Sequence, residues 1–194
     1  NKGSLVEIDI ATKAVIKTTP ISNPGAGNSS DVRPWGLSVH KGNVYVGSVA
    51  SGQIAGGASM RFFVQKYDGT SFTTILNESL NYEKGYIHLN YNRPNAPEIC
   101  KNWETWTADF DDIHTAGSST EGPRWCRPQP ILSDIEFDYD GSMIIAFMDR
   151  TGHQTGYLQA NTDANNLIIG NGYIGGEILR AANSNGTFIL ENGG

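Results

Sequence analysis

Residues 133–156, SDIEFDYDGSMIIAFMDRTGHQTG, decide the fold of this chain. Apolar and acidic residues alternate up to Phe137, the sequence turns at Asp140 and Gly141, and an apolar run, MIIAFM, follows. A period of two places successive side chains on opposite faces of a strand, and an Asp-Gly pair supplies the backbone freedom that a tight turn needs. The stretch therefore predicts a β-hairpin, with polar residues gathered where the second strand ends.

The composition favours an all-β protein. The chain has 194 residues, of which 23 are Gly and 8 are Pro, and these interrupt nearly every apolar run, so long helices are not expected. A net charge of -6 provides no basic face for phosphates, which makes nucleic acid and anionic membrane surfaces poor partners. No apolar run approaches the roughly 18 residues that a membrane span needs. Because the chain begins at Asn1, we expect a mature product or an excerpt of a larger chain.

The hairpin has a counterpart earlier in the chain. GLSVHKGNVYVGS, residues 36–48, aligns with DIEFDYDGSMIIAF, residues 134–147, with Leu37 on Ile135 and one extra residue in the second turn. The two copies are about 98 residues apart, which equals roughly two units of the 40 to 50 residues that form a four-stranded propeller blade. The alignment predicts a β-propeller of four-stranded blades.

Further hairpins fit the outer halves of such blades. Residues at about 36–49 and 133–148 are expected at equivalent inner positions of two blades. Closed propellers need at least four blades, so we expect over 1–194 either a single propeller domain or a fragment of a larger one. The region at about 82–130 is then an insertion or a poorly recognisable fourth blade. The outer hairpins are predicted at 4–21, 60–77 and 176–191, the last two with turns at Asp68-Gly69 and Asn185-Gly186.

Three stretches together carry a family resemblance: RPWGLSVHKGNVYVGSV at 33–49, residues 128–156, and GGEILRAANSNGTFILENGG at 175–194. They resemble the β-propeller region found upstream of SdrD B-like repeat modules in large secreted bacterial surface proteins. The most specific part is DRTGH at 149–153. The resemblance implies an extracellular, cell-surface location and a role in attachment or display. The repeat modules themselves are absent, so their calcium sites do not carry over.

The inserted region contains the two cysteines, Cys100 and Cys126, which bracket most of the tryptophans. They are either a disulfide or two buried free thiols. The extracellular character of the composition favours the disulfide, which would contribute about 3 to 4 kcal/mol to stability by restricting the unfolded chain.

Acidic residues suggest calcium as the only cofactor. The densest acidic cluster is formed by Asp109, Asp111 and Asp112 in the inserted region, and its oxygen atoms could hold calcium. The nearby tryptophans could stack on sugar rings. The favoured alternative is a solvated acidic loop with the tryptophans folded beneath it. The acidic run in 134–140 does not match an EF-hand loop, because its sixth position is Tyr139, where Gly is required. We expect its last aspartates to form a hairpin turn. The tryptophans of the inserted region are Trp103, Trp106 and Trp125.

The segment after the second strand is the best candidate ligand site. Asp149, Arg150 and His153 combine an acid, a guanidinium and an imidazole within five positions, and either grip a polar ligand or fasten adjacent blades. Trp35 and Asp134 are added as candidate ligand-binding residues. Trp35 follows the entry into one inner strand, whereas Asp149 leaves another, and we therefore expect the two residues at opposite rims.

The leading hypothesis for function is a non-catalytic extracellular binding or display module of a bacterial surface or filament-associated protein. Its partner would be a glycan or a protein at a propeller rim. One alternative is a glycan-active hydrolase or lyase that uses Asp134 or Asp149 with His153, and two such groups converging on the central channel would favour it. Another is a structural subunit whose exposed edge strands assemble with neighbours.

Overall fold

The computed structural model describes residues 3–84, 101–110, 113, 124–160 and 169–191. It confirms that the protein is all-β. Two four-stranded antiparallel sheets dominate, and within each sheet the strands follow one another in chain order. The first contains β3 (Val32–His40), β4 (Asn43–Ala50), β5 (Arg61–Tyr67) and β6 (Phe72–Ser79). The second contains β8 (Pro130–Phe137), β9 (Met143–Asp149), β12 (Glu177–Ser184) and β13 (Thr187–Leu190).

Smaller elements lie around these two sheets. A separate N-terminal hairpin pairs two strands, and a small sheet joins three short strands in the order β10-β11-β7. No described helix is long and apolar enough to cross a membrane. The smaller elements are β1 (Ser4–Ile8), β2 (Val15–Pro20), β7 (Arg124–Trp125), β10 (Gln159–Ala160), β11 (Ile169–Gly172), the helix α1 (Arg150–Gln154) and the 3-10 turns η1 (Ser29–Asp31) and η2 (Gly57–Ser59).

The predicted internal repeat is present in the strand pairing. Hairpin β3-β4 and hairpin β8-β9 open the two sheets and occupy equivalent positions. Each has a register shift near its start, between Pro34 and Gly36 in the first and between Leu132 and Asp134 in the second. A bulge at the same place in both copies shows that the repeat extends to local backbone geometry.

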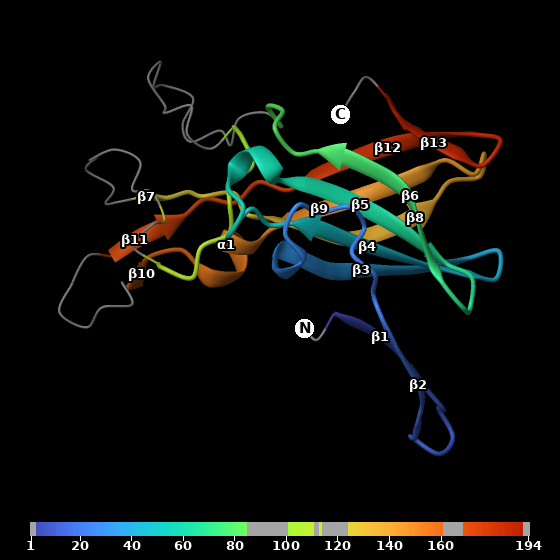
Figure 1. The fold of residues 1–194 in the computed structure, drawn as a ribbon. Coiled ribbons are helices and arrows are strands. Elements are labelled where there is room, and N and C mark those ends of the chain that lie inside the picture. Colours follow the sequence, from blue (N-terminus) through green and yellow to red (C-terminus); the bar gives the residue numbers. More distant parts are fainter. Residues whose placement is uncertain (1–2, 85–100, 111–112, 114–123, 161–168, 192–194) are drawn as a thin grey trace.

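The tight turns follow the predicted chemistry. Gly69, Gly141 and Gly186 all have positive φ angles, between 81° and 95°, which non-glycine residues rarely adopt. These turns gather with the β3-β4 turn at one end of the molecule, the hairpin end. The helix α1 and the small sheet lie at the opposite end, the loop end (Figure 1).

The two sheets pack face to face, and β3 lies against β8. Close approach depends on Gly47, where an added Cβ would stand 2.2 Å from Cδ2 of Leu132. Gly36 lies beside Leu132 as well, and His40 stacks on Phe137 with ring centroids 4.1 Å apart. Because both contacts proceed in the same order along the chain, β3 and β8 run in the same direction.

The main hydrophobic core fills the space between the sheets. Phe62 and Val64 from the first sheet face Ile135 and Ile145 from the second, and all four side chains are fully buried. Burying each large apolar side chain stabilises the fold by about 1.5 to 3 kcal/mol. Alternation along the strands sends every second residue to the outward face of its sheet.

The outward face of the first sheet is covered over only part of its width. Near β5, Lys17 from β2 donates to the hydroxyl of Tyr67, with an Nζ to Oη distance of 2.9 Å. Over β3 the face is open, and Trp35, Leu37 and Val39 are 59%, 55% and 70% exposed. In Figure 1 the β1-β2 hairpin projects away from the two sheets.

Candidate functional site

The loop end brings together the starts of β3 and β8 and the end of β9. Because β9 runs antiparallel to β8, Asp149 at the end of β9 pairs with Pro130 at the start of β8. Trp106 connects the two sheets there, since its backbone amide donates to the carbonyl of Ser51 at 3.0 Å and its indole Nε1 donates to the carbonyl of Pro130 at 2.8 Å. The expectation that Asp149 and the entry into β3 lie at opposite rims is therefore wrong. It treated β9 as if it ran with β3, whereas β9 returns toward the start of β8.

Asp149 is a buried capping residue. Its Oδ1 accepts hydrogen bonds from the backbone amides of Gln129 and Thr151, both at 2.9 Å, and the second of these caps α1. Its Oδ2 is buried and has no hydrogen-bond partner in the described part of the chain. Burial raises the pKa of Asp149 to about 6, although the amide hydrogen bonds and the charge of Lys84 act in the opposite direction.

Arg150 follows directly and is held in place by backbone and amide oxygens. Its Nη1 donates to the carbonyl of Thr107 at 2.8 Å and to Oε1 of Gln129 at 2.7 Å. Its guanidinium carbon lies 4.9 Å from the ring centroid of Trp106, which adds a cation–π contact. Arg150 as a whole is half-buried at the loop end, and both of these hydrogen bonds use Nη1.

A second guanidinium lies over the same ring. Cζ of Arg33, from the start of β3, is 5.4 Å from the ring centroid of Trp106, and Nη2 of Arg33 donates to Gln53 at 3.1 Å. Burial lowers the pKa of Arg150, and the charge of Arg33 lowers it further. Neither arginine has a carboxylate within ion-pair distance among the described residues. We call Arg33, Trp106 and Arg150 the arginine cluster.

The remaining predicted ligand residues do not converge on one point. His153 is exposed in the last turn of α1, and Trp35 is exposed at the bulge of β3. Asp134 is exposed on the outward face of the second sheet, where its Oδ1 accepts from the adjacent amide of Ile135. Asp149 lies on the opposite, inward face of that sheet. Asp134 and Asp149 therefore do not converge, whereas the hydrolase alternative, which uses either one with His153, stays a prediction.

The inserted region shows a mixed outcome. Asp109 is exposed, whereas Asp111 and Asp112 lie outside the described residues, so their role as calcium ligands stays a prediction. The described residues contain no group of three or more potential metal-ligating side chains. Trp103 and Trp125 are buried, with 5% and 2% exposure, and are therefore unsuited to stacking on a sugar.

Of the two cysteines, the structure describes Cys126. Cys126 is fully buried, and no free cysteine occurs among the described residues. Cys100 lies outside them, so the pairing of the two stays a prediction.

The acidic turn at 138–142 has the expected structure. Oδ1 of Asp140 accepts from the amide of Ser142 at 2.8 Å, and the amide of Gly141 donates to the carbonyl of Asp138 at 2.9 Å. Arg180 of β12 places its Nη2 2.5 Å from Oδ2 of Asp140. These contacts confirm the turn interpretation of this acidic run.

One half-buried polar cluster has no local sequence signal. Glu177, at the start of β12, accepts at Oε2 from the hydroxyl of Tyr82 at 2.6 Å and from Nε1 of Trp103 at 3.2 Å. Lys84 lies over the Trp103 ring, with Nζ 4.9 Å from the centroid. Burial, followed by the hydrogen bond to Glu177, raises the pKa of Tyr82 strongly. The cluster fastens the described ends of the inserted region to the second sheet.

Comparison with known proteins yields one distant similarity. No family model matches this sequence, and no solved structure matches it. The chain is similar to Colossin-C from Dictyostelium discoideum, with 26% identity over 181 residues. The alignment covers 92% of this chain but 15% of Colossin-C, so the chain spans a small part of that relative's length. This similarity does not bear on the resemblance to proteins with SdrD B-like modules.

Proposed function

We propose that this chain is part of a β-propeller and that it serves as a non-catalytic extracellular binding module within a larger protein. The fold part of the proposal rests on the repeated sheets. In both, four antiparallel strands follow in chain order, and the first strands, β3 and β8, run side by side in the same direction. Neighbouring propeller blades have this arrangement.

The N-terminal hairpin fits the same scheme. Strands β1 and β2 precede β3 in the chain and contact the first sheet near its third strand, as the outer half of a preceding blade would. The inner half of that blade would then cover the exposed stripe of Trp35, Leu37 and Val39. In this interpretation the chain contributes two complete blades and the outer half of a third.

The arginine cluster is the observation that carries the binding function. Two like charges are held over one indole ring, without a carboxylate partner among the described residues, in a protein of net charge -6. Holding like charges together is unfavourable, so an anionic group that binds both would gain unusually strong electrostatic attraction. We infer that the ligand is a glycan with carboxylate groups.

Binding to an array of oligosaccharides tests this assignment. The protein is expected to bind uronic-acid or sialic-acid oligosaccharides and not their neutral counterparts, and to lose affinity as salt rises. Arg33→Gln and Arg150→Gln should each weaken binding by about tenfold or more, because a charge-assisted hydrogen bond is worth about 1.5 to 3 kcal/mol. Arg61→Gln is the matched control, since Arg61 bonds Asn77 of β6, lies two strands away from β3 and is not part of the arginine cluster.

Two results would overturn the assignment. One is equal binding of acidic and neutral oligosaccharides, and the other is unchanged affinity in both variants at the loop end. Thermal unfolding of each variant shows whether the fold is intact, so that loss of binding is not confused with loss of structure.

Surface or filament-associated display is part of the same proposal. It retains what the family resemblance implied, while the similarity to a Dictyostelium protein gives no support to a bacterial source. Because Asp134 and Asp149 face opposite sides of one sheet, the proposal remains non-catalytic.

A further inference from the structure

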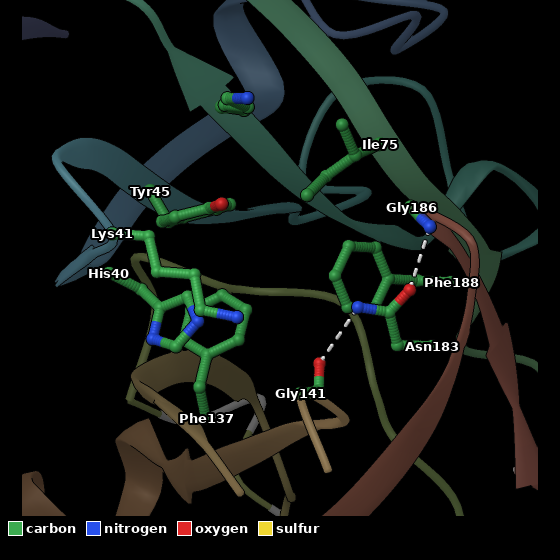
Figure 2. A pocket seen from close by; sticks show the side chains of 10 residues that line it. His40, Lys41, Tyr45, Ile75, Phe137, Gly141, Asn183, Gly186 and Phe188 are labelled. Carbon is green, nitrogen blue, oxygen red and sulfur yellow. Dashed lines mark hydrogen bonds between the residues drawn. The ribbon is translucent and has the colours of Figure 1, made fainter. Parts of the chain in front are cut away.

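A cleft opens between the two sheets at the hairpin end, far along the strands from the arginine cluster. It has a volume of about 150 Å³ and is lined by residues from seven strands and three turns. Figure 2 shows Tyr45, His40 and Phe137 gathered on one side of the cleft and Phe188 on the other. Its principal lining residues are Tyr45, Ile75, Phe137, Phe188, Lys41 and Lys66.

The walls of the cleft are aromatic. Phe137 stacks on His40, with ring centroids 4.1 Å apart, and contacts Tyr45 at 4.7 Å with the rings tilted by 56°. Phe188 meets the edge of Phe137 at a centroid distance of 6.2 Å. Because Phe188 belongs to the second sheet and Tyr45 to the first, the width of the cleft is set by the packing of the two sheets.

Lysine side chains give the cleft a positive charge. Lys66 pairs with Tyr45 across the β4-β5 ladder, which places both residues on the inward face of the first sheet. Lys66 is half-buried, and neither it nor Lys41 has a carboxylate partner among the described residues. The Asn183 amide in the same wall is already used, because its Nδ2 donates to the carbonyl of Gly141 at 3.2 Å (Figure 2).

We propose that this cleft binds a small aromatic carboxylate, with its ring between the aromatic walls and its carboxylate at Lys66. The volume agrees with one ring, since a dry protein cavity of about 150 Å³ accommodates a benzene molecule. Aromatic rings prefer tilted or offset neighbours, and the tilted Tyr45 and Phe137 pair offers such surfaces. A half-buried ammonium group without a counter-ion supplies the partner for the charge. This site is independent of the binding proposed at the loop end.

The proposal is tested with three probes: phenylacetate, benzyl alcohol and acetate. Phenylacetate should bind at least about tenfold more tightly than the neutral ring or the bare carboxylate, because it alone satisfies both parts of the cleft. In two-dimensional NMR spectra it should shift the ring signals of Tyr45 and Phe188. Similar affinity for all three probes, or shifts confined to other regions, would contradict the proposal.

Variants of the protein test the contribution of the Lys66 charge separately from that of the aromatic walls. Lys66→Met keeps an apolar side chain of similar length and should remove the preference of the cleft for phenylacetate over benzyl alcohol. Lys13→Met, in the β1-β2 turn, is the control for a general change in net charge and should keep that preference. An unchanged preference in a folded Lys66→Met protein would show that Lys66 does not bind the carboxylate.

Discussion

Asp149 shows how one residue can satisfy two interpretations of the same sequence. In DRTGH it precedes a polar cluster, which suggests a ligand site, but an aspartate just before a short helix is also a common N-cap. The structure selects the cap, because Oδ1 accepts from the amide of Thr151. Arg150 remains a candidate ligand-binding residue because its guanidinium group lies over Trp106 of the inserted region, a contact that the local sequence does not predict. Its neighbour Arg33 is distant in sequence, so their proximity was not predictable from spacing.

The buried carboxylate of Asp149 makes a prediction about pH. Its pKa is about 6 in the folded protein and near 3.8 when unfolded, so the native state binds the proton more tightly between these values. Wild-type stability relative to Asp149→Asn should therefore rise by about 3 kcal/mol as pH falls from above 6 to below 3.8. Asparagine keeps the cap and removes the charge.

Urea unfolding of both proteins at several pH values measures this difference. Most of the change should fall within the window between the two pKa values. Asp149→Ala is the control, and it should lose about 1 to 2 kcal/mol even at neutral pH because the cap is lost. If the stability difference between wild type and Asp149→Asn does not vary with pH, Asp149 does not have a raised pKa.

At the scale of elements, the sequence predicts hairpins but not the contacts between residues that are far apart in the chain. Alternation and Gly-containing turns located β5-β6, β8-β9 and β12-β13, because these signals arise within a few residues. The cluster of Tyr82 and Glu177 joins residues 95 positions apart, and no local pattern encodes such a pair. The parallel pairing of β7 with β11 is likewise non-local.

Gly47 provides a test of the packing between the two sheets. In Gly47→Ala the new Cβ would stand 2.2 Å from Leu132 Cδ2 and 3.1 Å from Ile135 Cδ1, in a fully buried position. Such overpacking should reduce the free energy of unfolding by about 1 to 3 kcal/mol. Gly27→Ala is the matched control, because nothing lies within 4 Å of its Cβ and its φ is not positive.

A second substitution identifies the cause. Combining Gly47→Ala with Leu132→Ala should cost less than the sum of the two single changes, because the shortened side chain leaves room for the new methyl group. Simple additivity in denaturant unfolding, or a Gly47→Ala protein as stable as Gly27→Ala, would refute close sheet contact at this point.

At the scale of the whole molecule, exposed apolar residues on the outward faces are what the proposed propeller section would be expected to show. A sandwich buries apolar residues on its inner faces and presents polar ones outside. Here β3 presents Trp35, Leu37 and Val39 outward, and β12 presents Ile178, which is 73% exposed. Sequence alternation alone could not reveal this, because the pattern of β3 shows which residues share a face but not whether that face is covered.

The exposed stripe on β3 leads to a prediction about association. If it is a surface that a neighbouring blade covers, the chain alone should self-associate through it, as contiguous exposed apolar patches tend to do. Leu37→Thr combined with Val39→Thr keeps β-branched or strand-compatible residues and should lower association, with stability changed by about 0.5 kcal/mol or less. Ile54→Thr is the control, since Ile54 is 61% exposed outside the strands. Sedimentation velocity over a wide concentration range measures the effect, and a wild-type chain that stays monomeric throughout would count against the stripe as a blade interface.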